Sequence, residues 1–158
     1  MLKKIGISLF FINYFFQKII RYNNKFPHLL HFTSRVRSPQ NISIVNTGSN
    51  AIYRCFAESP SVYIQALNGV EFHSCLNIAP GVKIISSNHN PGNLDEHLGS
   101  NPIRIGRKVW LGANVVILPG VELGDNVTIG AGSVVTKSIP SNSIAVGNPC
   151  KVIKNVCS

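Results

Sequence analysis

Histidine is the side chain that titrates near neutral pH, and the 158-residue chain holds five histidines. One of them, His89, stands in the string SNHNP, and His97 follows it after Asp95 and Glu96. A neutral imidazole can take the proton of a hydroxyl or an amine while that group attacks a carbonyl carbon. His89 is therefore a candidate general base, with Asp95, Glu96 or a backbone carbonyl as the partner of its other ring nitrogen.

The other histidines are weaker candidates for chemistry. His97 either touches an acceptor or is solvated, and we expect solvation. His73 lies 16 residues before His89 and is expected to be structural. His28 and His31 lie in a basic, proline-punctuated segment, where packing or solvent exposure is the expected role.

A six-residue period follows these candidates in the sequence. From 105 to 140 the sequence divides into IGRKVW, LGANVV, ILPGVE, LGDNVT, IGAGSV and VTKSIP. Each unit opens on an aliphatic residue, and a second small or aliphatic residue stands two places before the next opener. Residues two apart lie on one face of an extended segment, and the glycines and turn formers between the pairs allow the chain to bend.

This spacing favours a parallel β-helix over other folds. Apolar residues two and then four apart do not follow the 3.6-residue period of an α-helix, and a sandwich would need longer strands between its turns. Three units would make one triangular coil of 18 residues, with coils stacked at roughly 4.8 Å.

The period is interrupted once, at the polar stretch that holds His89. Apolar pairs are regular from Val62, and the first coil is expected near Ile42. The period breaks between 86 and 102, so that about nine residues, 90–98, are surplus to the coil. We expect them to form a loop projecting from one corner, where catalytic groups are often carried.

These repeats and the closing segment AVGNPCKVIK resemble the hexapeptide-repeat acyltransferases from about 42 to 154, and most closely the branch that acetylates sugars and surface polysaccharides. The resemblance implies an all-β fold, a left-handed parallel β-helix, although the usual crossover rule would predict the right hand. It also implies a homotrimer with acetyl-CoA between subunits and a saccharide hydroxyl as acceptor. Direct transfer needs no metal.

The resemblance assigns roles to individual residues. His89 matches the family's catalytic base, and Asn88, Asp95 and Trp110 are expected as its active-site neighbours. Five residues match the positions that contact CoA: Ala113, Ala131, Thr136, Lys137 and Lys151. Two of these depart from the family pattern, because Ala113 replaces a common serine and Lys151 a common arginine, which gives up the forked geometry of a guanidinium.

Three other functions are alternatives. An N-acetyltransferase acting on an amino sugar would use the same base and donor. A zinc carbonic anhydrase of this fold needs three histidines around one metal, but the spacing of His73, His89 and His97 does not resemble that family's. A non-enzymatic, membrane-associated module is the third, and no nucleic-acid-binding motif is present.

Before the repeats lies a helical and basic arm, 1–40, with seven Lys or Arg and no acid; the acyltransferase domain is expected at 41–154 and a tail at 155–158. The apolar helix expected in 1–22 is short for a bilayer span. It either lies on a membrane surface with its basic ends against anionic lipid or packs on protein. Four cysteines without close pairs suggest reduced thiols, and a cytoplasmic location is expected.

Overall fold

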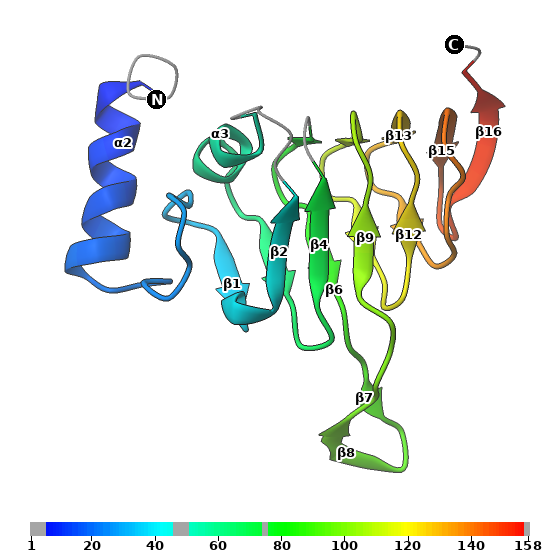
Figure 1. Cartoon of the computed structure of the whole chain (residues 1–158), viewed down its shortest axis with the longest axis horizontal. Helices are drawn as coiled ribbons and strands as arrows, with labels where there is room; N and C mark the ends of the chain where they lie inside the picture. Colours follow the sequence, from blue (N-terminus) through cyan, green and yellow to red (C-terminus); the bar gives the residue numbers. More distant parts are fainter. Residues whose placement is uncertain (1–5, 46–50, 74–75, 157–158) are drawn as a thin grey trace.

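The computed structural model describes residues 6–45, 51–73 and 76–156 of the chain (Figure 1). Lys3 and Lys4 of the predicted basic arm, Cys75 and Cys157, and the end of the predicted tail lie outside the described residues. The rest forms a row of short parallel strands with a helix at the N-terminal end of the row (Figure 1). The predicted mainly-β character is confirmed.

Apart from β7 and β8, which are described below, the strands form three sheets, here named A, B and C. Sheet A holds β1 (Arg35–Arg37), β3 (Tyr63–Gln65), β6 (Lys83–Ile85), β11 (Val116–Ile117) and β14 (Val134–Val135). Sheet B holds β2 (Ile42–Val45), β4 (Val70–His73), β9 (Ile103–Ile105) and β12 (Glu122–Leu123). Sheet C holds β5 (Asn77–Ile78), β10 (Trp110–Leu111), β13 (Val127–Ile129), β15 (Ser143–Val146) and the antiparallel β16 (Lys151–Asn155).

Where β9, β10 and β11 pair with β12, β13 and β14, the register follows the predicted 18-residue coil. Trp110 pairs with Thr128, and Ile117 pairs with Val135. The chain runs through β10, β11 and β12 before it returns to sheet C at β13, so it visits sheets C, A and B in turn. Each coil therefore has three corners, and residues at the same corner of successive coils lie in one column.

The buried interior consists of the aliphatic positions of the six-residue units. Each unit opener and each residue four places after it has an exposed fraction of at most 5%: Ile105, Val109, Leu111, Val115, Ile117, Val121, Leu123, Val127, Ile129, Ser133, Val135 and Ile139. Complete burial of one such aliphatic side chain contributes about 1.5–3 kcal/mol. The predicted inward positions are confirmed.

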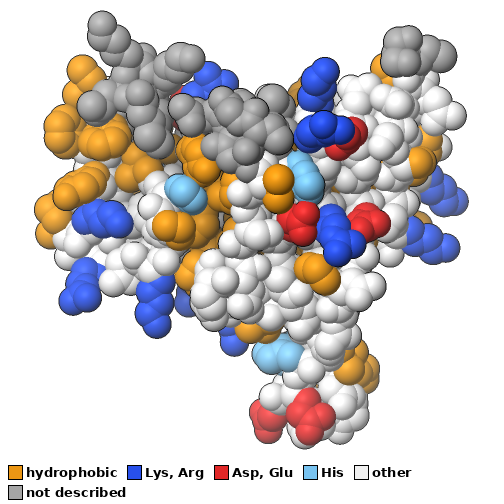
Figure 2. All heavy atoms as spheres, viewed as in Figure 1, with side chains coloured by type: hydrophobic (Ala, Val, Ile, Leu, Met, Phe, Trp, Pro, Cys, Tyr) orange, Lys and Arg blue, Asp and Glu red, His pale blue; other side chains and the backbone are white. Residues whose placement is uncertain are grey.

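The interruption in the period forms a projection from the corner between sheets A and B. It is an antiparallel hairpin of β7 (His89–Asn90) and β8 (Asn93–His97), and every residue from 91 to 99 is exposed. Figure 2 shows it extending away from the body, with acidic side chains at its far end. The predicted projection is confirmed, and its strands were not foreseen.

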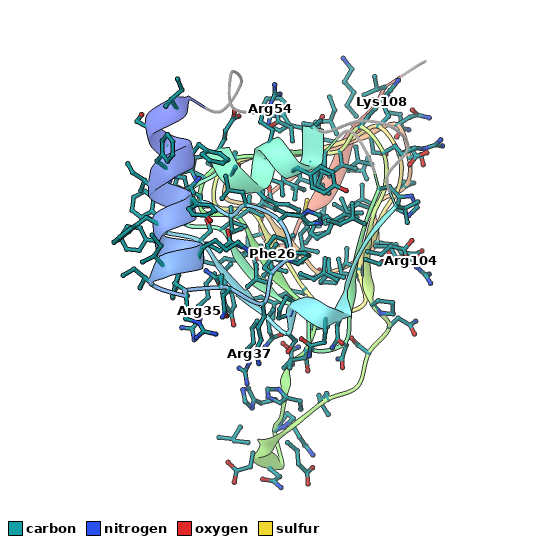
Figure 3. The ribbon with its side chains drawn as sticks, turned by 60° about the vertical axis from the view of Figure 1, so that its left-hand side comes forward. Phe26, Arg35, Arg37, Arg54, Arg104 and Lys108 are labelled. Carbon is teal, nitrogen blue, oxygen red and sulfur yellow. The ribbon has the colours of Figure 1, made fainter. Side chains whose placement is uncertain are left out.

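The first coil differs from the prediction in two respects. The predicted start near Ile42 is wrong, because β1 already pairs with β3, with Val36 beside Ile64. This strand holds one apolar residue between two arginines, which gave no repeat signal. The helix α3 (Ala51–Glu58) was also missed; it buries Phe56 between Phe26 and Phe72, with ring centroids 5.3 and 5.5 Å away (Figure 3).

The predicted N-terminal helix is present. It comprises α2 (Ile7–Tyr14) and a continuing π-helical turn, η1 (Phe15–Ile19), and a 3-10 turn, η2 (Pro39–Asn41), precedes β2. Among the helices that the structure describes, none is both long enough and apolar enough to cross a bilayer.

Candidate active site

A backbone carbonyl fixes the orientation of His89 at the start of the hairpin. The ring Nδ1 of His89 lies 2.6 Å from the carbonyl oxygen of Leu94. Because a carbonyl oxygen can only accept, Nδ1 must carry the hydrogen of this bond. In the neutral ring Nε2 then keeps its lone pair, and an exposed imidazole in this tautomer can accept a proton.

His97 lies directly across the hairpin from His89. The two residues are register partners of β7 and β8, and their ring centroids are 4.3 Å apart at an angle of 39°. Both side chains are exposed. His97 therefore packs on one face of the catalytic candidate, and the prediction that it is simply solvated misses this contact.

The acidic residues of the hairpin do not hold His89. Asp95 is exposed, and its own backbone N–H is bonded to Asn93 Oδ1 at 3.2 Å. The side chain of Glu96 accepts a hydrogen bond from Asn90 at 3.1 Å. Of the partners left open by the sequence, the backbone carbonyl is the one found.

Buried polar groups join the base of the hairpin to the coil below it. The side-chain oxygen of Gln65 accepts a hydrogen bond from the N–H of Ser87 at 3.0 Å. Ser87 Oγ and Asn68 Nδ2 both donate to the carbonyl of Leu98, at 3.0 and 2.8 Å. The carbonyl of Asn88 accepts from the N–H of Leu98 at 2.8 Å, which places this expected neighbour of His89 at the base of the hairpin.

These anchoring residues were not foreseen as part of the site. Asn68 was readable as a corner residue because Gly69 follows it, but its bond to the hairpin joins residues 30 apart in sequence. Gln65 occupies a strand position in β3 and is only 7% exposed. The one signal in the sequence is a glutamine near the end of the apolar strand segment VYIQA.

Trp110 lies on the outer surface of sheet C. It occupies β10 and is 54% exposed, whereas Leu111 beside it is fully buried. The predicted outward orientation is therefore confirmed. An exposed indole next to a buried core residue is a ready contact surface for a ligand or a second subunit.

Ala113 and Ala131 lie one above the other at the corner between sheets C and A. The carbonyl of Ala113 accepts from the N–H of Gly132 at 2.8 Å. Within the described part of the chain, neither the N–H of Ala113 nor that of Ala131 has an acceptor, although the amides of Gly112, Asn114 and Gly132 are bonded. This corner therefore offers two stacked N–H groups beside small side chains.

The other three residues predicted to contact CoA lie elsewhere on the surface. Thr136 and Lys137 follow β14 and are exposed at the corner between sheets A and B. Lys151 begins β16, which pairs with β15 at the edge of sheet C, and is also exposed.

Within one chain these residues do not form a single site. His89 follows β6 of sheet A and precedes β9 of sheet B, so it projects from the A–B corner. Ala113 follows β10 of sheet C and precedes β11 of sheet A, so it lies at the C–A corner. The candidate base His89 and the two free N–H groups of Ala113 and Ala131 are therefore at different corners of the same stack of coils.

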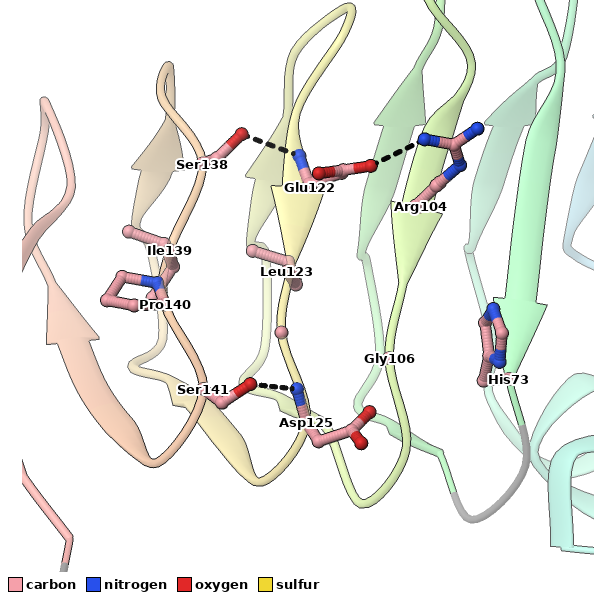
Figure 4. A pocket seen from close by; sticks show the side chains of 11 residues that line it. His73, Arg104, Gly106, Glu122, Leu123, Asp125, Ser138, Ile139, Pro140 and Ser141 are labelled. Atoms are coloured by element: carbon pink, nitrogen blue, oxygen red, sulfur yellow. Dashed lines mark hydrogen bonds and ion pairs between the residues drawn. The ribbon is translucent and has the colours of Figure 1, made fainter.

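A hollow of about 640 Å³ lies over sheet B (Figure 4). A ladder of polar contacts crosses it: Arg104 donates to Glu122 at 2.7 Å, and the Glu122 N–H donates to Ser138 at 2.9 Å. At one end His73 is hydrogen-bonded to Glu71 at 2.8 Å, which supports the structural role expected for it.

An ion pair at the corner between sheets B and C shifts the pKa of a carboxyl group. Arg107 donates two hydrogen bonds to Asp125 Oδ2, at 3.0 and 2.6 Å. These bonds from the guanidinium hold the pKa of the Asp125 carboxyl below its usual value. The pair joins neighbouring coils at the surface, and nothing links it to His89.

A zinc centre is not supported by the positions of the histidines. Among the described residues, no group of three or more His, Cys, Asp or Glu side chains is arranged to hold a metal ion, and His73, His89 and His97 do not form one. His73 is hydrogen-bonded to Glu71, His89 to the carbonyl of Leu94, and the rings of His89 and His97 contact each other.

The coils match known proteins. Residues 102–137 match the family model described as bacterial transferase hexapeptide (six repeats). The chain is 34% identical to a maltose O-acetyltransferase from Clostridium difficile 630, whose crystal structure aligns with a TM-score of 0.54 over 79% of this chain and 67% of that one. This chain belongs to the hexapeptide-repeat acyltransferase family. The membership predicted from the six-residue units is confirmed.

Other relatives define how far the similarity reaches. The galactoside O-acetyltransferase of Escherichia coli (strain K12) is 48% identical over 82 residues, which are 50% of this chain and 40% of the relative. The match therefore spans less than half of that protein. An N-acyltransferase from Bacillus cereus, solved in complex with dTDP and Coenzyme A, aligns with a TM-score of 0.63 at 17% identity and shares the fold.

Proposed function

We propose that this chain is an acetyl-CoA-dependent O-acetyltransferase that acts on a saccharide, with His89 as its general base. The observation that carries the proposal is the 2.6 Å bond between His89 Nδ1 and the Leu94 carbonyl, which leaves Nε2 as the proton acceptor. The sugar acceptors named for the maltose and galactoside relatives support the acceptor class.

The donor is proposed to lie along the C–A corner. The free N–H groups of Ala113 and Ala131 fit the amide carbonyls of a pantetheine arm, and the small side chains leave room for it. Lys137 and Lys151 supply charge for the phosphates of CoA. The N–H of Ala113 is the one suited to the oxyanion that forms as the thioester is attacked, and the N–H of Ala131 then serves the pantetheine arm.

The two corners are proposed to meet between subunits of a homotrimer. In a closed ring, the A–B corner of one subunit faces a different surface of the next, so a base and a donor site from separate chains can form one cleft. The separation of His89 and Ala113 within one chain supports this arrangement. Trp110 and Asp95 then lie on surfaces available to the acceptor.

The fold proposed for this function is a left-handed parallel β-helix spanning the repeats, with α3 in its first coil and the hairpin inserted at a later corner. The 18-residue register and the hexapeptide match support it. In this arrangement the acyltransferase domain, the N-terminal arm and a short tail are the three parts of the described chain.

Transfer proceeds directly from donor to acceptor within a ternary complex, with no acyl group carried on the enzyme. His89 Nε2 takes the proton of the acceptor hydroxyl while its oxygen attacks the thioester carbonyl. The tetrahedral oxyanion collapses, the C–S bond breaks, and the imidazolium returns the proton to the leaving CoA sulfur. An amine acceptor would follow the same route, so O- and N-transfer differ in the acceptor alone.

Replacing His89 by Ala tests the proposal. Turnover with labelled acetyl-CoA and a panel of sugars should fall roughly 100- to 10,000-fold, with CoA binding retained. His97→Ala is the matched control, because it removes the neighbouring exposed imidazole and should lose far less. Retained turnover in His89→Ala would contradict the role of this residue, and faster acetylation of amino groups than of hydroxyls would favour N-transfer.

A further inference from the structure

The N-terminal helix buries two polar side chains, Asn13 and Gln17, and exposes most of its large apolar side chains, which is the inverse of an ordinary amphipathic helix. Asn13 and Gln17 are 0% and 2% exposed. Ile7, Phe11 and Ile19 are 67%, 60% and 62% exposed. A helix that packs on protein by hydrophobic burial has the opposite pattern.

Hydrogen bonds from these two buried polar side chains hold the helix on the protein, beside the stacking of Phe16 on Phe32 at 5.3 Å. Asn13 donates to the carbonyl of Ala57 in α3 at 2.9 Å and accepts from the N–H of Phe32 at 3.0 Å. Gln17, one turn later on the same face, donates to the carbonyls of Phe26 and His28 and accepts from the N–H of Leu30. These bonds to backbone groups therefore fix which face of the helix turns outward.

The outward face is one continuous apolar stripe. Ile7, Phe11, Phe15 and Ile19 recur every four residues, so their side chains lie in a row along the helix. Tyr14, Ile12, Ile20 and Tyr22 are exposed beside them. Figure 2 shows hydrophobic side chains gathered over this helix. An exposed patch of this kind marks a surface that something covers.

A basic groove lies at the end of the stripe. It has a volume of about 450 Å³ and its lining includes Arg21, Lys25, Arg35 and Arg37 and no acidic residue. Figure 3 shows Arg35 and Arg37 beyond the end of the helix. In the described part of the chain none of these four cations has an acidic partner, and the sequence holds no acid before Glu58.

We propose that the stripe and the groove together form a docking surface for an anionic phospholipid membrane. The helix lies in the plane of the interface with Phe11 and Phe15 among the acyl chains, and the cations of the groove contact lipid phosphates. The helical part, 8 residues in α2 and 5 in η1, is too short to span a bilayer, which needs roughly 20.

Charge argues against a second copy of the chain as the occupant. A symmetric contact uses the same patch on both subunits, so both sides of it would carry Lys18 and the cations of the groove and neither side would carry an acidic residue. Like charges placed opposite one another oppose association. An anionic surface instead complements both the apolar stripe and the surrounding positive charge.

Vesicle co-sedimentation of the full-length protein tests the proposal. The chain should bind vesicles of phosphatidylcholine with about a third phosphatidylglycerol, and it should bind phosphatidylcholine alone far more weakly. Added salt should weaken the binding, since the phosphate contacts are screened. Phe11→Gln/Phe15→Gln and Arg35→Gln/Arg37→Gln should each reduce the partition coefficient at least tenfold.

Matched controls lie at the far end of the row of strands. Ile153, 64% exposed in β16, and Lys154 beside it give Ile153→Gln and Lys154→Gln, which should bind vesicles as the wild type does. Thermal unfolding should show all variants to be folded, because the substituted side chains are at the surface. Acetyl transfer to a soluble sugar should be unchanged in the helix variants.

Three results would overturn the proposal. One is equal binding to neutral and anionic vesicles. Another is a change in oligomeric state, rather than in vesicle binding, when Phe11 and Phe15 are replaced, since this would make a second copy the occupant. The third is displacement from vesicles by millimolar inorganic phosphate with no effect of the Phe variants, which would reduce the groove to a site for free anions.

Discussion

His89 Nδ1 and the carbonyl oxygen of Leu94 lie 2.6 Å apart between the two strands of the hairpin, and this contact decides which ring nitrogen is basic. A backbone carbonyl cannot ionise, so the orientation of the imidazole does not depend on a neighbouring carboxylate. The position of the proposed base depends instead on how firmly the hairpin is joined to the coil.

Gln65 makes that joint, and its replacement by Leu should weaken both stability and turnover. Its side-chain oxygen accepts from the N–H of Ser87, and loss of this acceptor leaves a buried donor unpaired at a cost of about 1–3 kcal/mol. Urea unfolding and steady-state kinetics measure the two effects. Gln40→Leu, at an exposed glutamine, is the control. Equal losses of stability and turnover in the two variants would contradict the role of Gln65 in joining the hairpin to the coil.

Gly112 sets the close approach of coils at the proposed donor corner. A Cβ on Gly112 would lie 2.6 Å from the backbone nitrogen of Ala131. Gly112→Ala should therefore destabilise the protein by about 1–3 kcal/mol and weaken CoA binding, because the two coils must separate. Gly99→Ala, where a Cβ meets nothing within 4 Å, should leave both quantities nearly unchanged.

Trp110 provides a spectroscopic signal for the donor site. It is the one tryptophan of the sequence and is 54% exposed, so its emission should shift to shorter wavelength if CoA or a neighbouring subunit covers it. Titration with CoA should give a saturable shift in the wild type and a weaker one in Ala131→Phe. A saturable shift of the same midpoint in both proteins would argue against the Ala131 contact.

The burial of His31 predicts that the protein loses stability on acidification. It is 8% exposed, its Nδ1 accepts the N–H of Thr33 at 3.3 Å, and burial lowers its pKa below the usual 6.5. The unfolded chain therefore takes up a proton at a higher pH than the folded chain does. The free energy of unfolding should fall as the pH drops through about 6.5 and below.

The contribution of His31 is measured by difference. Urea unfolding of the wild type and His31→Gln over the range from about pH 7.5 to 5 gives two slopes of free energy against pH. The wild-type slope should be the steeper, with His28, whose pKa burial also lowers, contributing to both. Identical slopes would contradict a folded-state pKa that lies below the unfolded one.

The repetitive part of the fold was readable because its rule is local. Every opener from Ile105 to Val135 is buried, since two-residue alternation and glycine corners allow one arrangement of the chain. The surplus of residues at 90–98 identified the projection for the same reason. A break in a strict period is as informative as the period itself.

The remaining features depend on contacts between distant backbone groups. The carbonyl of Leu94 has no sequence signature, and Gln17 reaches the carbonyl of His28 eleven residues away. The strand β1 carries arginines on its solvent side, so its single inward valine shows no pattern. The helix α3 has apolar residues at helical spacing but spans only 8 residues, too few for its period to stand out.

Mixing two inactive variants tests most directly whether His89 of one subunit serves a donor bound on the next. His89→Ala lacks the base, and Ala131→Phe fills the donor corner at an exposed position. Random association of equal amounts should restore about a quarter of wild-type acetyl transfer, because one site in four receives both intact halves. No recovery in refolded mixtures, with both variants trimeric, would contradict a site shared between chains.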